Sequence, residues 1–268
     1  MRICEAPDDI PDIQSQADNR EVPLSKVGVR GLEYPIRLLD KVKKVQLAAA
    51  TADLFADLPQ HFKGAHMSRF VEIFHRYHED ISMPRFMEML SCIRQELEAR
   101  SAFASLSFPY FIEKSAPVSG LPGMVSYRCC FRGRVSDRAC DVFSVAVSVP
   151  VNAVCPCSKA ISDRGAHNQR GIVTVEVEQG PFFWIEDLIA LVESSASSPV
   201  YSLVKREDEK YLTERAYDNP MFVEDLVRDV YVKIREMGRF PRFSVEAENF
   251  ESIHNHSAYA FAEYVRHT

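Results

Sequence analysis

The order of strand-like and helix-like segments is the strongest constraint on how this chain can fold. Segments follow the order strand, strand, helix, helix, strand, strand, and this order occurs twice along the 268 residues. Consecutive strands of this kind pair antiparallel and place their helices on one face. The pattern predicts an α+β fold with two tandem units, each an antiparallel sheet with helices. Because open sheets leave edges unpaired, we expect edges to pair between units or subunits into barrels in an oligomer.

The predicted units have definite limits along the chain. Residues 1–22 are rich in Asp, Pro, Gln and Asn and predict a flexible N-terminal arm, followed by a first unit at 23–138 and a second at 139–268. The segment 45–58 is ambiguous: its alanines favour a helix, but its position between strands favours a strand. Strands are predicted at 26–36, 45–58, 103–113, 123–132, 141–151, 170–178, 240–248 and 259–265, with helices within 61–77 and at 83–100, 182–195 and 220–236.

Composition excludes several classes of protein. The net charge of −6 argues against nucleic-acid binding, and no apolar run approaches the ~20 residues that a membrane span requires. The first residues do not resemble a signal peptide, so we expect a cytoplasmic protein. In that compartment the seven cysteines are expected to be thiols or metal ligands rather than disulfides.

Reactive side chains are concentrated in one stretch, Pro150–Arg170. Its sequence is PVNAVCPCSKAISDRGAHNQR, which combines the thiols of Cys155 and Cys157 with the imidazole of His167 and the cations Lys159 and Arg170. An apolar strand pattern precedes it, and alternating valines follow it. Polar side chains on a loop between two rigid strands are typical of a functional site.

Four residues of mixed type could bind a metal, although they lie far apart in sequence. They are Cys155, His167, Glu209 and His254. Their spacing alone does not identify a site, and each has a structural alternative. Cys155 could be a small core residue, His167 a hydrogen-bonding loop residue, Glu209 part of a solvated helix face, and His254 part of a polar turn with His256.

Longer motifs resemble one known family. The string CPCSKAISDRGAHNQR closely resembles the signature of the type IB GTP cyclohydrolases I, the largely bacterial form of the first enzyme of folate synthesis. The segments KGAHMSRF (63–70), LVKREDEKYLTERAYDNPMFVED (203–225) and ESIHNHSAYA (251–260) resemble the same family. The resemblance implies the tunnelling fold, in which paired sheets form barrels, with active sites at the subunit interfaces of a homotetramer.

The resemblance also implies an activity and a set of site residues. GTP and water would become 7,8-dihydroneopterin triphosphate and formate, through attack on C8 of the purine by a water that the metal makes acidic. Cys155, His167, Glu209 and His254 would hold the metal, with Cys155, His167 and His254 also catalytic. Such ligands are borderline in softness, so Zn²⁺, Mn²⁺ and Fe²⁺ all fit. Glu224 would anchor the guanine base, and Lys63, Arg69, Lys159, Arg170 and His256 would contact the substrate.

Two other classes of function remain open. A nitrile reductase of the tunnelling fold also uses a Cys and a purine-anchoring Glu, but its Cys would be a covalent nucleophile that needs NADPH and no metal. A non-catalytic protein could use the same Cys and His residues to stabilise an interface through a metal. The context of Cys155 and the presence of His254 favour the cyclohydrolase.

Overall fold

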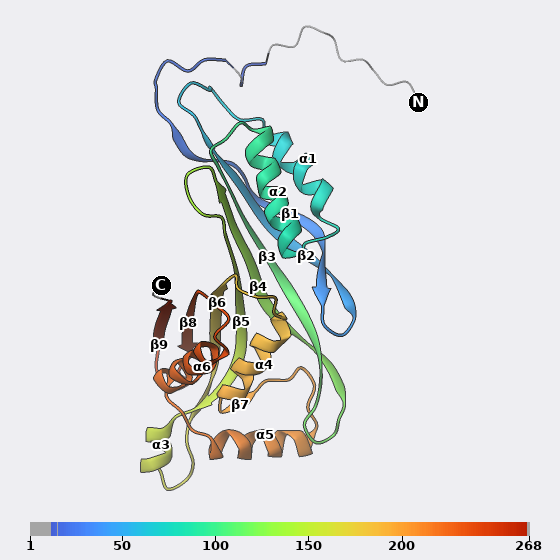
Figure 1. The fold of residues 1–268 in the computed structure, drawn as a ribbon. Coiled ribbons are helices and arrows are strands. Elements are labelled where there is room, and N and C mark those ends of the chain that lie inside the picture. The colour runs from blue at the N-terminus through green and yellow to red at the C-terminus, as the bar shows by residue number, and fades with distance from the viewer. Residues whose placement is uncertain (1–11, 15, 267–268) are drawn as a thin grey trace.

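A single antiparallel sheet runs through the whole molecule (Figure 1). The computed structural model describes residues 12–14 and 16–266. Its nine strands follow the order β1-β2-β3-β4-β5-β6-β8-β9, and the short β7 pairs with β5 outside this path. The strands are β1 (Leu24–Asp40), β2 (Lys44–Leu58), β3 (Ser101–Ser115), β4 (Pro122–Ser136), β5 (Val142–Val154), β6 (Asn168–Glu178), β7 (Ser198–Pro199), β8 (Arg242–Asn249) and β9 (Ala258–Val265). The helices are α1 (Met67–Tyr77), α2 (Met83–Glu96), α3 (Pro156–Ile161), α4 (Ile185–Ser195), α5 (Arg206–Asp218) and α6 (Val223–Met237).

Alternation of side chains along the strands produces one buried face. In β6, Val173, Val175 and Val177 are completely buried, while the residues between them are partly exposed. Val175 pairs with Val147 of β5, so the two strands bury the same face. Successive side chains on a strand point to opposite faces, which is why the valines form one apolar stripe.

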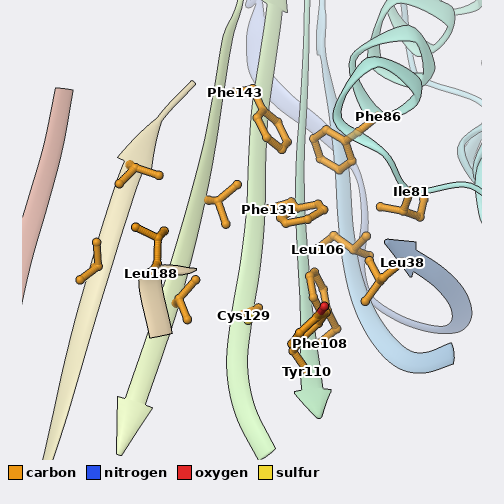
Figure 2. Packing of buried hydrophobic residues seen from close by; sticks show 14 of the residues in the cluster. Leu38, Ile81, Phe86, Leu106, Phe108, Tyr110, Cys129, Phe131, Phe143 and Leu188 are labelled. Atoms are coloured by element: carbon orange, nitrogen blue, oxygen red, sulfur yellow. The ribbon is translucent and has the colours of Figure 1, made fainter. Parts of the chain in front are cut away.

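Two groups of helices cover this buried face. Helices α1 and α2 lie over the strands of the first half, and α4 and α6 lie over those of the second half (Figure 1). Gly133 of β4 allows the close approach of α2, because an added Cβ would lie 2.6 Å from Leu90 and 2.7 Å from Phe86. Phe86 of α2 and Phe143 of β5 both contact Phe131 of β4, so the core is continuous between the two groups (Figure 2).

The prediction of two separate tunnelling-fold units is wrong. Strand β4 pairs with β5 from Arg128↔Ser148 to Arg134↔Val142, which joins the two halves into one sheet over one core. The sequence pattern could not reveal this pairing, because a strand that ends one unit looks like a strand that continues a sheet. The boundary at residue 138 stays a prediction, and most of the predicted arm lies outside the described residues.

The individual elements agree well with the sequence prediction. All eight predicted strands and all four predicted helices are present, including the ambiguous segment 45–58, which forms β2. The sequence prediction did not include the short α3 or the two-residue β7, and it raised the helix α5 only as the solvated helix face considered for Glu209. Within the described residues, no helix combines the length and apolar character that a membrane crossing would need.

Candidate functional site

Cys155 and His167 lie opposite each other where the β5–β6 pair ends. The last paired residues of these strands are Val154 and Asn168, so Cys155 and His167 are the next residue on each side. The backbone N–H of Cys155 donates to the carbonyl of His167 at 3.2 Å. The structure therefore brings together two predicted metal ligands that are twelve positions apart in the sequence.

Ser158 fixes the loop that connects these two residues. Its hydroxyl donates to the carbonyl of Cys155 at 3.1 Å and accepts the backbone N–H of His167 at 3.2 Å. Its own backbone N–H points at the Cys155 sulfur, 3.5 Å away. Cys155 thus precedes α3 as its N-cap, and its half-buried thiol receives an N–H donor.

Two polar residues that sequence analysis did not select contact His167. The Oε1 atom of Gln169 lies 2.9 Å from His167 Nδ1, and Gln169 Nε2 donates to Glu251 Oε1 at 3.2 Å. The second oxygen of Glu251 lies 3.8 Å from the same Nδ1 atom. The sequence does hold one signal for Gln169: it is in phase with the buried stripe of β6 and is only 7% exposed.

The loop between β8 and β9 carries the predicted ligand His254. This loop begins at Phe250, whose backbone N–H donates to the carbonyl of Arg170 at 2.9 Å, and continues through Glu251. The exposed rings of His254 and His256 stack with centroids 4.9 Å apart. His254 therefore lies three residues from Glu251, which contacts His167 directly, in a segment tied to the start of β6.

The start of α6 also lies at this end of the sheet. The backbone N–H of Met221 donates to the carbonyl of Val154 at 3.0 Å, next to Cys155. Glu224 follows in the first turn of α6 with an exposed side chain, while Asp225 accepts the N–H of Phe222 at 3.2 Å. The positive end of the helix dipole stabilises a carboxylate here. Glu224 is thus available to a ligand.

Helix α5 holds the predicted substrate residue Lys159 but keeps Glu209 at a distance. The Lys159 ammonium donates to the carbonyl of Tyr217 and lies 4.2 Å from the centroid of the Tyr217 ring. Glu209 precedes Tyr217 by eight residues, or about 12 Å of helix. Its side chain is exposed. A single chain therefore does not bring Glu209 to the Cys155–His167 pair.

A buried carboxylate fixes the start of α5. Asp208 is fully buried and accepts four hydrogen bonds, from the backbone of Val118 at 2.8 Å, the backbone and hydroxyl of Ser119 at 2.9 and 2.6 Å, and the backbone of Lys205 at 2.9 Å. Burial by itself would raise the pKa of Asp208, but these hydrogen bonds hold that pKa well below its usual range. The carboxylate ties α5 to the β3–β4 loop.

We expect Asp208→Asn to destabilise the fold in a pH-dependent way. An amide would place N–H groups against N–H donors, so the melting temperature at neutral pH should fall by roughly 5–10 °C. A lowered carboxyl pKa contributes stability above the ordinary value of about 3.9 and loses it as the pH falls below that value. Thermal melts should therefore show a gap between wild type and variant that narrows below about pH 4. Asp218→Asn, at the exposed other end of α5, is the control. An equal difference in melting temperature at neutral pH and below about pH 4 would contradict this account.

The predicted substrate cations are divided between the two ends of the molecule. Arg170 is exposed beside the Cys155–His167 pair. Lys63 precedes α1, and Arg69 lies on α1, where its side chain donates to the carbonyl of Glu96 at 3.0 Å. Figure 1 places α1 at the opposite end of the sheet from α3 and α5. Lys63 and Arg69 are therefore remote from Cys155 within one chain.

The described residues of one chain do not contain a complete metal site. Across residues 12–14 and 16–266, no group of three or more His, Cys, Asp or Glu side chains is arranged to hold a metal ion. Cys155 and His167 are adjacent, and His254 lies in a neighbouring exposed loop. The arrangement supplies a thiol and an imidazole at one end of the sheet, and the other predicted metal ligands, Glu209 and His254, do not join them in one group.

Comparison with known proteins links this arrangement to one family. Residues 10–260 match the family model described as type I GTP cyclohydrolase folE2. A GTP cyclohydrolase FolE2 of Syntrophus aciditrophicus is 53% identical over 252 residues, covering 94% of this chain and 98% of the relative. That of Citrifermentans bemidjiense is 51% identical over 254 residues, covering 95% of this chain and 94% of the relative.

Comparison of structures concerns the fold alone. A hyper-thermostable AgUricase mutant overlaps with a TM-score of 0.51 at 6% sequence identity, covering 90% of this chain and 92% of that chain. This overlap spans both halves of the sheet as one body. Together with the β4–β5 pairing, it replaces the predicted pair of tunnelling-fold units by one continuous sheet of the urate oxidase kind.

Proposed function

Because this chain belongs to the FolE2 family of type I GTP cyclohydrolases, we propose that it converts GTP and water to 7,8-dihydroneopterin triphosphate and formate. The match extends over almost the whole chain, so the chain is a GTP cyclohydrolase that serves folate biosynthesis. The observation that carries the location of the chemistry is the meeting of Cys155 and His167 at the end of the β5–β6 pair. The finer assignment to type IB rests on the string from Cys155 to Arg170.

The reaction consumes water at C8 of the purine. Addition of water there opens the imidazole ring to a formamide, and hydrolysis of this formamide releases formate. The ribose then opens and rearranges, and ring closure onto the freed amines returns one water, so the net consumption is one water. Each stage moves protons, and we assign these transfers to His254, because an imidazole has one ring nitrogen that can accept a proton and one that can donate it.

Two residues at this end of the sheet, Cys155 and His167, have the chemistry to bind a divalent metal ion. Cys155 offers a sulfur that already receives an N–H donor, and His167 has its Nδ1 atom engaged, which leaves Nε2 for a ligand. His254 and Glu209 complete the proposed donor set, whose mixed softness suits Zn²⁺, Mn²⁺ or Fe²⁺. When bound, such an ion makes water more acidic and polarises the bond that water attacks.

Assembly into an oligomer would complete the site that one chain leaves incomplete. The two outer strands, β1 and β9, each pair on one side only within the described residues. On β9, Tyr259 and Phe261 are 60% and 52% exposed, which is costly for aromatic side chains on an unpaired edge. We propose a homo-oligomer, a tetramer, in which a neighbouring subunit supplies Glu209, Lys63 and Arg69 to each site. Active protein that sediments only as a monomer would contradict this assembly.

Substrate recognition follows from the charges at this end of the sheet. Glu224 would accept hydrogen bonds from the guanine base, because a carboxylate accepts N1–H and the exocyclic amine in parallel. Lys159 follows Cys155 by four residues and Arg170 follows His167 by three, and both would suit the triphosphate, with His256 beside His254 as a further contact.

A turnover assay tests the proposed function directly. Protein stripped by a chelator should be incubated with GTP and with Zn²⁺, Mn²⁺ or Fe²⁺, while formate and the fluorescent oxidised pterin are measured together. We expect both products in equal amounts and only in the presence of a divalent ion. Absence of both with every ion would overturn the proposal, and formation of formate without pterin would overturn its later steps.

A further inference from the structure

Gln169 is a polar residue on the apolar face of the sheet. It is in phase with Gly171, Val173 and Val175 along β6, all of which are buried, and it is itself 7% exposed. Burial of an amide is costly unless its donor and acceptor are both satisfied. Both are satisfied here, through His167 on one side and Glu251 on the other.

The chemistry of these three side chains gives the chain of hydrogen bonds a direction. An ionised carboxylate only accepts, so the Gln169 atom that faces Glu251 must be the amide nitrogen, as observed at 3.2 Å. The amide oxygen of Gln169 must then face His167 Nδ1, at 2.9 Å. A carbonyl oxygen also only accepts, so the Nδ1 atom of a neutral His167 has to carry the proton.

We propose that Gln169 and Glu251 are positioning residues that hold His167 in the Nδ1–H tautomer and direct the lone pair of its Nε2 atom to the metal ion. This inference rests on the proposed function. The Glu251 carboxylate strengthens the preference, because its second oxygen lies 3.8 Å from the same Nδ1 atom. Partners of this kind fix both the tautomer and the ring orientation of metal-binding histidines.

Burial of His167 and Glu251 strengthens the hydrogen bonds that fix the tautomer of His167. The side chains of His167 and Glu251 are 16% and 14% exposed, so water competes little for their hydrogen bonds. Without the partner at Nδ1, the imidazole could protonate at Nε2 and offer Nδ1 instead, which would move the metal-binding lone pair to another side of the ring. The positioning role thus belongs to two residues that are 82 positions apart.

The tautomer can be measured in the metal-free protein. Two-bond ¹⁵N–¹H spectra of histidine-labelled protein at about pH 8.5, above the ordinary imidazole pKa of about 6.5, report which ring nitrogen carries the proton. The His167 signals are assigned by their loss in His167→Gln. We expect Nδ1–H in wild type and a shift toward Nε2–H, the form preferred by a free histidine side chain, in Gln169→Leu. Glu251→Gln has the same expected shift. An amide at position 251 can donate as well as accept, so it no longer fixes which polar atom of Gln169 faces His167.

Gln46→Leu is the matched control. Gln46 also makes amide hydrogen bonds at both of its polar atoms, to Asp40 and to the backbone of Phe111, but it lies on β2 away from His167. Its replacement should lower stability and leave the tautomer of His167 unchanged. If Gln46→Leu loses as much stability as Gln169→Leu but keeps the wild-type tautomer of His167, the effect of Gln169 on the tautomer is a positioning effect and not a general loss of structure.

Metal affinity provides the second measurement. In a chelator competition, Zn²⁺ should bind about 10–100-fold more weakly to Gln169→Leu and Glu251→Gln than to wild type, with no change in Gln46→Leu. Nε2–H in wild type, an unchanged tautomer in both variants, or unchanged affinity would each overturn the positioning role. Neither measurement uses GTP, so an inactive wild type that shows these shifts would contradict the proposed function alone. Equal Zn²⁺ affinity in His167→Gln and wild type would remove His167 from the metal site and overturn both.

Discussion

Cys155→Ala should lower kcat/KM for GTP by about 1000-fold or more, equivalent to about 4 kcal/mol of transition-state free energy. The substitution removes the one thiolate from the proposed donor set, and divalent-metal affinity should fall with it. The fold should survive, because the Cys155 sulfur makes a single long contact with the N–H of Ser158, at 3.5 Å. The backbone bond between Cys155 and His167 does not need the thiol.

Cys140→Ala is the control for this experiment. Cys140 is an exposed free thiol between β4 and β5, so its loss removes a cysteine without touching the β5–β6 end. Activity, metal content after dialysis and the thermal midpoint should be measured for both variants. Full activity of Cys155→Ala, or an equal loss in Cys140→Ala, would remove Cys155 from the catalytic centre. Unfolding of Cys155→Ala would instead make its role structural.

Local patterns explain why most elements of the fold could be predicted from the sequence. The valines of β6 alternate with polar residues, and Gly238 ends α6 in a left-handed conformation with φ of 63°, which glycine adopts without strain. Helix α5 was raised only as an alternative for Glu209, because its sequence is polar on nearly every side and shows no apolar stripe. Its position depends on the buried Asp208, which binds backbone and hydroxyl groups about 90 residues earlier in the chain.

The continuous sheet and the surroundings of His167 could not be predicted in the same way. Pairing of β4 with β5 is a choice between strands of similar character, and nothing in either strand distinguishes the end of a unit from the middle of a sheet. The contact between Gln169 and Glu251 depends on β8 pairing with β6, which aligns Asn249 with Gly171. Cys155 and His167 were within reach of prediction, because each lies within four residues of a predicted strand, 141–151 or 170–178.

Replacement of Glu224 should chiefly weaken the binding of guanine nucleotides. Its carboxylate is exposed in the first turn of α6, near the Met221–Val154 hydrogen bond that holds this turn beside Cys155. Loss of two hydrogen bonds to a charged group should lower GTP affinity about 100-fold in Glu224→Ala, or about 2.7 kcal/mol. Glu224→Gln should bind GTP nearly as weakly as Glu224→Ala, because one of the two polar atoms of the glutamine amide is a donor that faces a guanine donor. Bound metal should remain in both variants.

Inosine triphosphate makes this prediction specific to the base. It lacks the exocyclic amine of guanine, so wild type should bind it at least about 10-fold more weakly than GTP, as expected for one lost hydrogen bond to a carboxylate. Glu224→Ala should bind the two nucleotides almost equally, since the group that distinguishes them is gone. Glu236→Ala, in the exposed last turn of the same helix, should keep the wild-type preference. Loss of metal from Glu224→Ala, or an unchanged preference for GTP, would show that Glu224 does not anchor the base.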